Sequence, residues 1–388
     1  MSRRGVLLAL AAAALAAAFL HRPGRVTDLN ITVSCARVLA GGGDPYAQDL
    51  VIDGVTYPCL YPPLAFDMFR PLTALVDYAP AFGARAWSAF QVLLFLIMLY
   101  IWRSRFLAPG VEAARLAFAL TAFGGPLFVV LHSGNAATVE QVLLWSAFAL
   151  YAAGHDAAFV AAIALAAQFK LQPAVFLVLV LLRPKPNWRA FAAGGAAMLL
   201  LFGLNEAIHP GLLASMRARM TNPAEGWPYE RGPNNCSVLG FVQHALETAW
   251  ADRSAANVWS RRLFVPWALF VAAATVAALR RVWAAAQDEN AARRATVLLA
   301  CAAYALLAPR FKDYAYFLLI PPALVALESG IPNGLRAAIV ILALLNSTKA
   351  AALNLGMGQW ALLAGYFKLY AAVLVWGVLV RRTKSPVP

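Results

Sequence analysis

Long apolar runs alternate with polar segments along this chain, and the pattern predicts an all-α, polytopic membrane protein. Several runs are shorter than the roughly 20 residues of a full crossing, so we expect about 10–12 transmembrane or re-entrant helices in one domain over residues 1–388. The pair 157–169 and 172–182 is either a hairpin or a re-entrant, broken helix with FKLQP at its tip. The predicted segments are about 5–20, 82–102, 116–132, 137–153, 157–169, 172–182, 190–207, 263–279, 295–308, 314–327, 335–348 and 360–380.

Basic residues occupy the short connections on one side of these segments, as expected for cytoplasmic loops. Both termini then lie on the cytoplasmic side of the plasma (inner) membrane, and the long polar segments 21–81 and 208–262 lie on the opposite, outer side. The run 5–20 also has the basic start of a signal peptide, but we interpret it as a retained helix. The inward-facing basic residues are Arg3, Arg4, Arg103, Arg105, Arg115, Arg183, Lys185, Arg189, Arg280, Arg281, Arg293, Arg294, Arg336, Arg381, Arg382 and Lys384.

Composition agrees with the membrane interpretation. The chain is 62% hydrophobic and only 13% charged, with a net charge of +14. Short cytoplasmic loops and anionic lipid head groups account for this basic excess, so we expect membrane lipids as partners and no nucleic acid. The prevalence of Ala and Arg indicates a GC-rich bacterial genome.

The first outer segment is expected to form a fixed structure. Residues 28–40 have helical periodicity and predict an amphipathic helix along the membrane surface, with Leu29, Val33, Ala36 and Ala40 on its apolar face. The GGGDPY sequence ends it, since Gly permits positive φ and Pro blocks continuation. Cys35 and Cys59 lie in this segment and Cys236 in the second outer loop, so a Cys35–Cys59 disulfide is one possible pairing.

Asp28 is the first candidate for chemistry. It follows closely on the first apolar run, where a carboxylate is costly to desolvate unless it is paired or used. One interpretation is an N-cap that accepts backbone N–H groups at the start of helix 28–40. The other is a catalytic base at the membrane surface, and the two roles are compatible.

Cationic side chains gather at the same predicted face. Lys170 either snorkels to the interface or meets a negative partner. Arg310, Lys312 and Asp313 form either a solvated turn or an anion site, because Arg and Lys both bind phosphate oxygens. His132 is either an interfacial residue or a further phosphate ligand.

Polar residues and absent motifs limit the class of substrate that the protein can use. Asn, Ser and aromatic side chains suit sugar binding, although they also make ordinary loops. The chain has no Gly-rich Lys-Ser/Thr phosphate loop, no Gly-x-Ser-x-Gly elbow, no Asp-x-Asp pair and no Cys/His metal spacing. A membrane enzyme without this machinery needs a donor that is already activated in the membrane, such as a polyprenyl-phosphate sugar. The candidate substrate ligands are Tyr61, Asn135, Asn234, Asn235 and Ser237.

The order of these motifs resembles glycosyltransferase family 87, the polyprenyl-phosphate-mannose-dependent type of the GT-C superfamily. The motifs are Asp28 after the first helix, GGGDPY, YPPLA, HSGNAATVEQ, FKLQP, NNCS and PRFKDY. The resemblance implies a GT-C-like fold and inverting, metal-independent transfer of a sugar, expected to be mannose, to a lipid-linked or glycan acceptor, without a cofactor. It implies Asp28 as general base, and Arg310, Lys312, Lys170 and His132 as ligands of the donor phosphate.

The competing class is a carrier of lipid-linked sugars or anions. A carrier would show charges within its membrane helices and inverted repeats. We find neither in the sequence, and a carrier has no need of two long, asymmetric outer loops.

Overall fold

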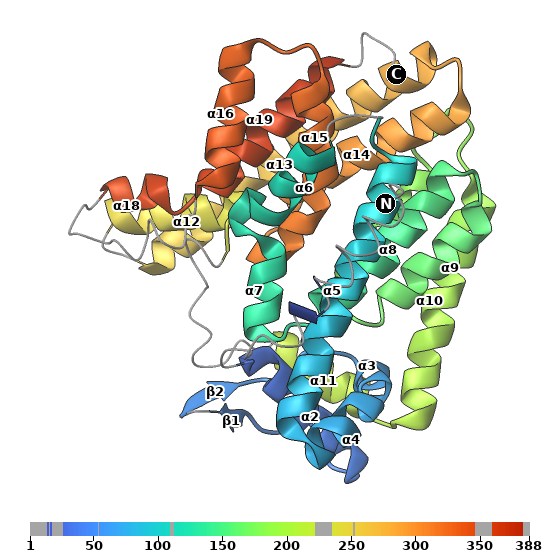
Figure 1. The fold of residues 1–388 in the computed structure, drawn as a ribbon, viewed down its shortest axis with the longest axis vertical. Helices are drawn as coiled ribbons and strands as arrows, with labels where there is room; N and C mark the ends of the chain where they lie inside the picture. The colour runs from blue at the N-terminus through green and yellow to red at the C-terminus, as the bar shows by residue number, and fades with distance from the viewer. Residues whose placement is uncertain are drawn as a thin grey trace.

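The computed structural model describes residues 26–52, 54–108, 112–221, 235–250, 253–345 and 359–382, together with positions 14, 16 and 17. Most of the run 5–20 therefore lies outside the described residues. Helices form most of the described part of the chain (Figure 1), which confirms the all-α expectation. The bundle comprises α5 (Pro80–Arg105), α6 (Glu112–Thr121), η1 (Ala122–Gly124), α7 (Pro126–Ser133), α8 (Ala137–Ala152), α9 (Asp156–Ala166), η2 (Gln172–Val180), α10 (Trp188–Ile208), α13 (Arg253–Ala285), α14 (Glu289–Leu307), η4 (Asp313–Leu319), α15 (Ile320–Glu328), α16 (Asn333–Leu344) and α19 (Phe367–Arg382).

Membrane-spanning potential is concentrated in a few helices. In the described part of the chain, α5, α10 and residues Ser254–Ala285 of α13 are long and apolar enough to cross a bilayer. The predicted run 116–132 is instead a broken pair, bent by 60° between Ala113–Gly124, which ends with η1, and Pro126–Ser133. Several other predicted runs form shorter helices that pack inside the bundle.

The hairpin of α9 and η2 enters and leaves the bundle at one end. Arg183, just after η2, donates to Asp156 at the start of α9 at 2.6 Å, so the two ends of the hairpin are joined. An eleven-residue helix such as α9 is about 16 Å long, roughly half of a bilayer core. The segment is a short helical hairpin, and at its tip Phe169 is buried whereas Leu171 is exposed.

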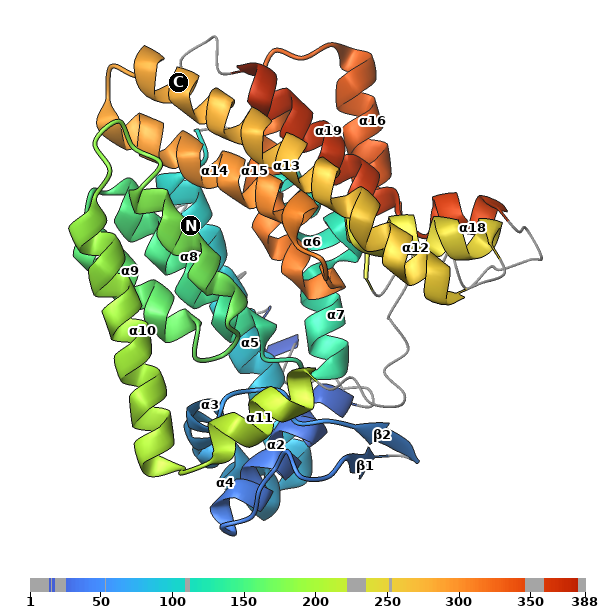
Figure 2. The ribbon, with the colours of Figure 1, turned by 180° about the vertical axis from the view of Figure 1, so that it is seen from behind.

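A second layer covers the opposite end of the bundle, at the bottom of Figures 1 and 2. The amphipathic helix predicted at 28–40 is present as α2, which packs against α3, α4 and α7. One feature differs from expectation: Ala40, which was predicted on the apolar face, is exposed. The layer comprises α2 (Thr27–Ala40), β1 (Leu50–Ile52), β2 (Val55–Tyr57), α3 (Pro63–Met68), α4 (Arg70–Tyr78) and α11 (Leu212–Thr221); α12 (Val238–Ala249) and α18 (Gln359–Ala364) lie to one side.

Covalent and turn chemistry hold this layer in place. Cys35 and Cys59 form a disulfide, which resolves the pairing that the sequence left open. Gly42 takes a φ of +76° after the end of α2, as the GGGDPY turn predicts. The strands β1 and β2 form an antiparallel hairpin that we did not expect, although an Asp-Gly turn between β-branched residues is its usual signature.

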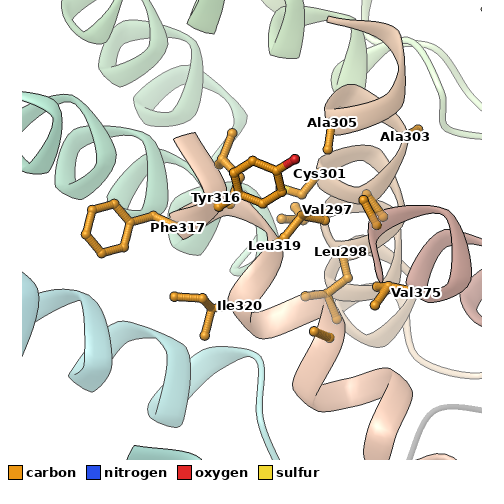
Figure 3. Packing of buried hydrophobic residues seen from close by; sticks show 14 of the residues in the cluster. Val297, Leu298, Cys301, Ala303, Ala305, Tyr316, Phe317, Leu319, Ile320 and Val375 are labelled. Atoms are coloured by element: carbon orange, nitrogen blue, oxygen red, sulfur yellow. The ribbon is translucent and has the colours of Figure 1, made fainter. Parts of the chain in front are cut away.

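The core of the bundle lies between α14, η4 and α19 (Figure 3). Tyr316 is fully buried and its ring stacks on Phe123 at 5.3 Å between ring centroids. Its hydroxyl donates to the carbonyl of Cys236 at 3.0 Å, which attaches the segment just before α12 to the core. Phe123 has a φ of +56°, and its stacking on Tyr316 supports this unfavourable backbone where η1 breaks the helix.

Candidate active site

Asp28 lies in the first turn of α2, at the layered end of the bundle. The N-cap interpretation is wrong: Val26 is the N-cap, and no side-chain cap bond is present. The carboxylate instead accepts a hydrogen bond from Nδ2 of Asn135 at 2.8 Å. This contact joins two motifs that lie 107 residues apart in the sequence.

Further hydrogen bonds fix the position of Asn135 itself. Its Oδ1 accepts from the backbone N–H of Ala137 at 2.8 Å, and its carbonyl accepts from Nε2 of Gln91 at 2.7 Å. Trp87 adds a bond of 2.9 Å from Nε1 to the neighbouring carbonyl of Gly134. The predicted substrate ligand Asn135 therefore uses both ends of its amide to orient Asp28 and to begin α8.

Gly134 allows α2 to approach this turn. Its φ is +72°, and an added Cβ would lie 2.7 Å from Cβ of Leu29, the residue after Asp28. Gly154 has a similar φ of +86°, but an added Cβ there meets nothing within 4 Å. The two glycines share the left-handed backbone conformation, but only Gly134 lies close to another helix.

Gly134→Ala is expected to lower both stability and transfer activity. The left-handed conformation costs about 1–2 kcal/mol in either alanine variant, and overpacking against Leu29 adds about 1–3 kcal/mol only in Gly134→Ala. Thermal unfolding and transfer rates of both variants measure this difference. Equal losses in Gly134→Ala and Gly154→Ala would show that the contact with α2 contributes nothing.

Lys170 occupies the tip of the α9–η2 hairpin and meets a negative partner. Its Nζ lies 2.8 Å from Oε2 of Glu140, on the first turn of α8, so the snorkelling interpretation is wrong. The same ammonium lies 4.4 Å from the ring centroid of Tyr314. We did not single out Glu140 from the sequence, although it is the only charged residue of the apolar segment 137–153.

Tyr61 packs against the hydrophobic cluster that contains Leu29, next to Asp28, and Phe169, next to Lys170. Its phenol lies within electrostatic reach of Asp28, Glu140 and Lys170. Burial raises the pKa of Tyr61 well above its usual value, although the Lys170 charge acts in the opposite direction. The carbonyl of Tyr61 accepts from the hydroxyl of Tyr46 at 2.6 Å, so the GGGDPY turn fixes its position.

A buried amide network supports the tip from the other side. Asn205 of α10 donates from Nδ2 to Oε1 of Gln168 at 2.9 Å. Its Oδ1 accepts from the backbone N–H of Leu64 at 2.8 Å. One fully buried side chain thus ties the YPPLA segment to the tip that carries Lys170.

The segment 309–313, which carries Arg310 and Lys312, is docked on the residues just before α12. Asn235 accepts from the backbone N–H of Phe311 at 2.8 Å, and Ser237 donates to the carbonyl of Pro309 at 2.8 Å. Both predicted sugar ligands are buried and make these structural bonds. Their observed contacts hold the cationic segment in place.

Asp313 pairs with a residue that we missed. Nζ of Lys368, in the first turn of α19, lies 2.7 Å from Oδ1 of Asp313, and Lys368 is 0% exposed. Its signal was visible as a cation within the apolar segment 360–380, so the expectation of no charges within the helices is wrong. The interpretation of 310–313 as a solvated turn is also wrong, because Phe311 is buried and Asp313 is ion-paired.

The remaining predicted residues are less central. Arg310 and Lys312 are half-buried on the docked segment. His132 is exposed on the last turn of α7, and within the described residues no hydrogen bond or ion pair joins it to this cluster. Asn234 lies outside the described residues. No group of three His, Cys, Asp or Glu side chains suited to a metal occurs among the residues that the structure describes.

Comparison with known proteins identifies the family. The family model described as Glycosyltransferase family 87 matches residues 60–309, well over half of the chain. No curated protein matches the chain. A crystal structure of ArnT from Cupriavidus metallidurans, bound to undecaprenyl phosphate, aligns with 16% identity and a TM-score of 0.46 over 100% of this chain and 78% of that one. The family match alone is decisive, because it includes the tip that carries Lys170 and the loop of Asn235 and Ser237: the chain belongs to glycosyltransferase family 87.

Proposed function

We propose that this protein is an integral membrane glycosyltransferase that moves a sugar, mannose by family resemblance, from a polyprenyl-phosphate donor to a lipid-linked or glycan acceptor. The reaction is inverting and metal-independent, and it takes place at the outer face of the plasma membrane. Family membership supports the enzyme class. Asp28 precedes the matched residues 60–309, so its role rests on the geometry of the site.

One observation carries the proposal: the segments of Asp28 and Lys170 pack together, because their neighbours Leu29 and Phe169 belong to one hydrophobic cluster. Asn135 orients the carboxylate, Tyr61 packs against the same cluster, and Lys170 contacts Tyr314 next to the segment of Arg310 and Lys312. A base and a set of cations are therefore brought together from distant segments. Group transfer from a phosphate ester needs this combination.

In the proposed step, Asp28 takes the proton of an acceptor hydroxyl while the hydroxyl oxygen attacks the anomeric carbon from the face opposite the phosphate. The new glycosidic C–O bond forms as the bond between the anomeric carbon and the phosphate oxygen breaks. The electron pair of that bond leaves with the polyprenyl phosphate, which gains negative charge. Arg310, Lys312 and Lys170 stabilise this charge because they are already in place before it develops.

The donor class follows from the chemistry of the site. The sequence lacks the Asp-x-Asp pair of metal-bound nucleotide sugars, and the candidate cations lie on segments within or next to the apolar bundle. A phosphate attached to a polyprenyl chain reaches these cations from the lipid phase. Arg and Lys are the usual ligands of such phosphates.

Transfer of radiolabel from polyprenyl-phosphate-mannose to extracted lipids and glycans, in membranes with and without the protein, tests this function. We expect label in a new product only with the protein. If mannose is not transferred, polyprenyl-phosphate-arabinofuranose is the second donor to use. Absence of transfer from both donors, together with protein-dependent movement of the lipid-linked sugar across vesicles, would contradict the enzyme.

Arg310→Ala is expected to weaken donor binding by about 10- to 100-fold, because one charge-assisted hydrogen bond to a phosphate contributes about 1.5–3 kcal/mol. A titration of the purified protein with polyprenyl phosphate measures this. Arg85→Ala is the matched control, since Arg85 is also half-buried and lies in the first turns of α5. Unchanged affinity in Arg310→Ala would remove Arg310 from the phosphate site.

Transfer is expected to continue in the presence of EDTA. The cations of the proposed mechanism are Arg and Lys side chains, which a chelator does not remove. The transfer rate is measured before and after EDTA treatment, and again after Mg²⁺ or Mn²⁺ is added. Loss of activity that either metal restores would contradict this part of the proposal.

The carrier alternative gains support from charges buried within helices, of which Lys368 of α19 is the most completely buried. Intramembrane charges often mark transport pathways. Here the ammonium is fully buried against Asp313, and that pairing fixes the segment of Lys312 rather than lining a path. Together with the family match, this favours the transferase.

A further inference from the structure

A concave site lies at the other end of the bundle, away from Asp28. It has a volume of about 1090 Å³ and is formed where α5 and α6 end beside α14, α15, α16 and α19. The α9–η2 hairpin opens at this same end, through Asp156 and Arg183. The cavity is therefore separate from the proposed transfer site.

Arginine side chains concentrate in this cavity. Arg105, Arg115, Arg294 and Arg382 contribute to its walls, and Glu328 is the one acidic residue in its lining. Glu328 pairs with Arg115 at 2.6 Å, and Asp288 lies 3.6 Å from Arg294 outside the lining. Positive charge remains in excess, so an anion is the complementary ligand.

An apolar track continues from these charges between two helices. On α6, Ala114, Ala117 and Thr121 face the cavity at helical spacing, and on α16, Val340 and Leu344 do the same one turn apart. The residues 114–121 cover about 10 Å along α6. The cavity thus combines a cationic head with an apolar side, as an amphiphile requires.

We propose that this cavity binds an anionic phospholipid, with the phosphate among the arginines and an acyl chain between α6 and α16. Basic pockets between helices at the membrane surface bind phospholipid head groups in this way. A soluble phosphate would use the arginines alone and leave the apolar track without a function. The inference does not depend on the proposed transfer reaction.

The test is native mass spectrometry of the purified full-length protein, titrated with phosphatidylglycerol or phosphatidylcholine. Arg105→Gln/Arg382→Gln is compared with Lys185→Gln/Arg189→Gln, which removes two exposed charges from the same end outside the cavity. An arginine near a lipid phosphate contributes about a fivefold gain in affinity, so the first double variant is expected to bind phosphatidylglycerol about 30-fold more weakly. The control double variant is expected to bind it as the wild type does.

The single variant Arg105→Gln keeps the test valid if loss of Arg382 disturbs the fold, since Arg105 is exposed and is expected to give about a fivefold loss. Equal affinity of the wild type for both lipids would overturn the proposal. An equal loss in the control double variant would also overturn it, because the effect would then be one of general surface charge. Displacement of the lipid by an equal concentration of glycerol phosphate would overturn it in favour of a soluble phosphate ligand.

Discussion

Asp28→Asn is expected to lower the rate of sugar transfer by about 10²–10⁴-fold, the contribution typical of a general base. The substitution keeps the shape of the side chain and removes only its ability to take a proton. Its amide oxygen still accepts from Nδ2 of Asn135, the contact that is 2.8 Å long in the wild type. Folding and donor binding are therefore expected to remain close to those of the wild type.

Radiolabel transfer, thermal unfolding and polyprenyl phosphate titration measure the three quantities in the same preparations. Asp77→Asn is the matched control, because Asp77 is a carboxylate of the same layer whose contact is an exposed ion pair with Arg37. Asn135→Ala is expected to lower the rate less than Asp28→Asn does, since it disorders the base without removing it. A folded Asp28→Asn protein with near-normal turnover would refute the assignment of the base.

Lys368→Met is expected to lower the free energy of unfolding by about 3–5 kcal/mol, because it leaves the carboxylate of Asp313 without its partner in the core. Methionine retains the length and most of the apolar contacts of the lysine stem. Only the charge and its pairing are lost. Unfolding in mixed SDS micelles measures the change.

The double variant Lys368→Met/Asp313→Asn is expected to recover most of that loss, since the second substitution removes the uncompensated charge. Lys185→Met, on an exposed loop, controls for the general effect of losing a lysine. Lys368→Met is also expected to weaken donor binding, because Asp313 adjoins Lys312. A double variant as unstable as the single one would show that the ion pair is not the reason for the loss.

The sequence predicted the elements that are determined by residues close to one another in the chain. The surface helix at 28–40 is present as α2 because its apolar residues recur at helical spacing and a glycine turn ends it. The PRFKDY, FKLQP and HSGN motifs were each recognisable as breaks between apolar runs. Their order along the chain was sufficient to indicate the family.

The sequence was less successful in assigning the role of a residue that interacts with a partner far away in the chain. Asp28 has the residue type of an N-cap, but the helix begins at Thr27 and the carboxylate turns to Asn135. Lys170 has the chain length to snorkel, but Glu140 lies 2.8 Å away. A buried charge stays with the nearest opposite charge, because that contact offsets its loss of hydration.

By itself, then, the sequence determined the membrane class, the surface helix, the family and the motifs that carry charge, because periodicity, charge distribution and motif order are properties of the chain. Only the tertiary structure decided that Arg183 meets Asp156 at the open end of the 157–182 hairpin, that Cys35 pairs with Cys59, and that Lys368 lies against Asp313. Each of these joins segments whose separation along the chain says nothing of their distance in space. Helix packing brings them together, and packing depends on the shapes of all the surfaces that meet.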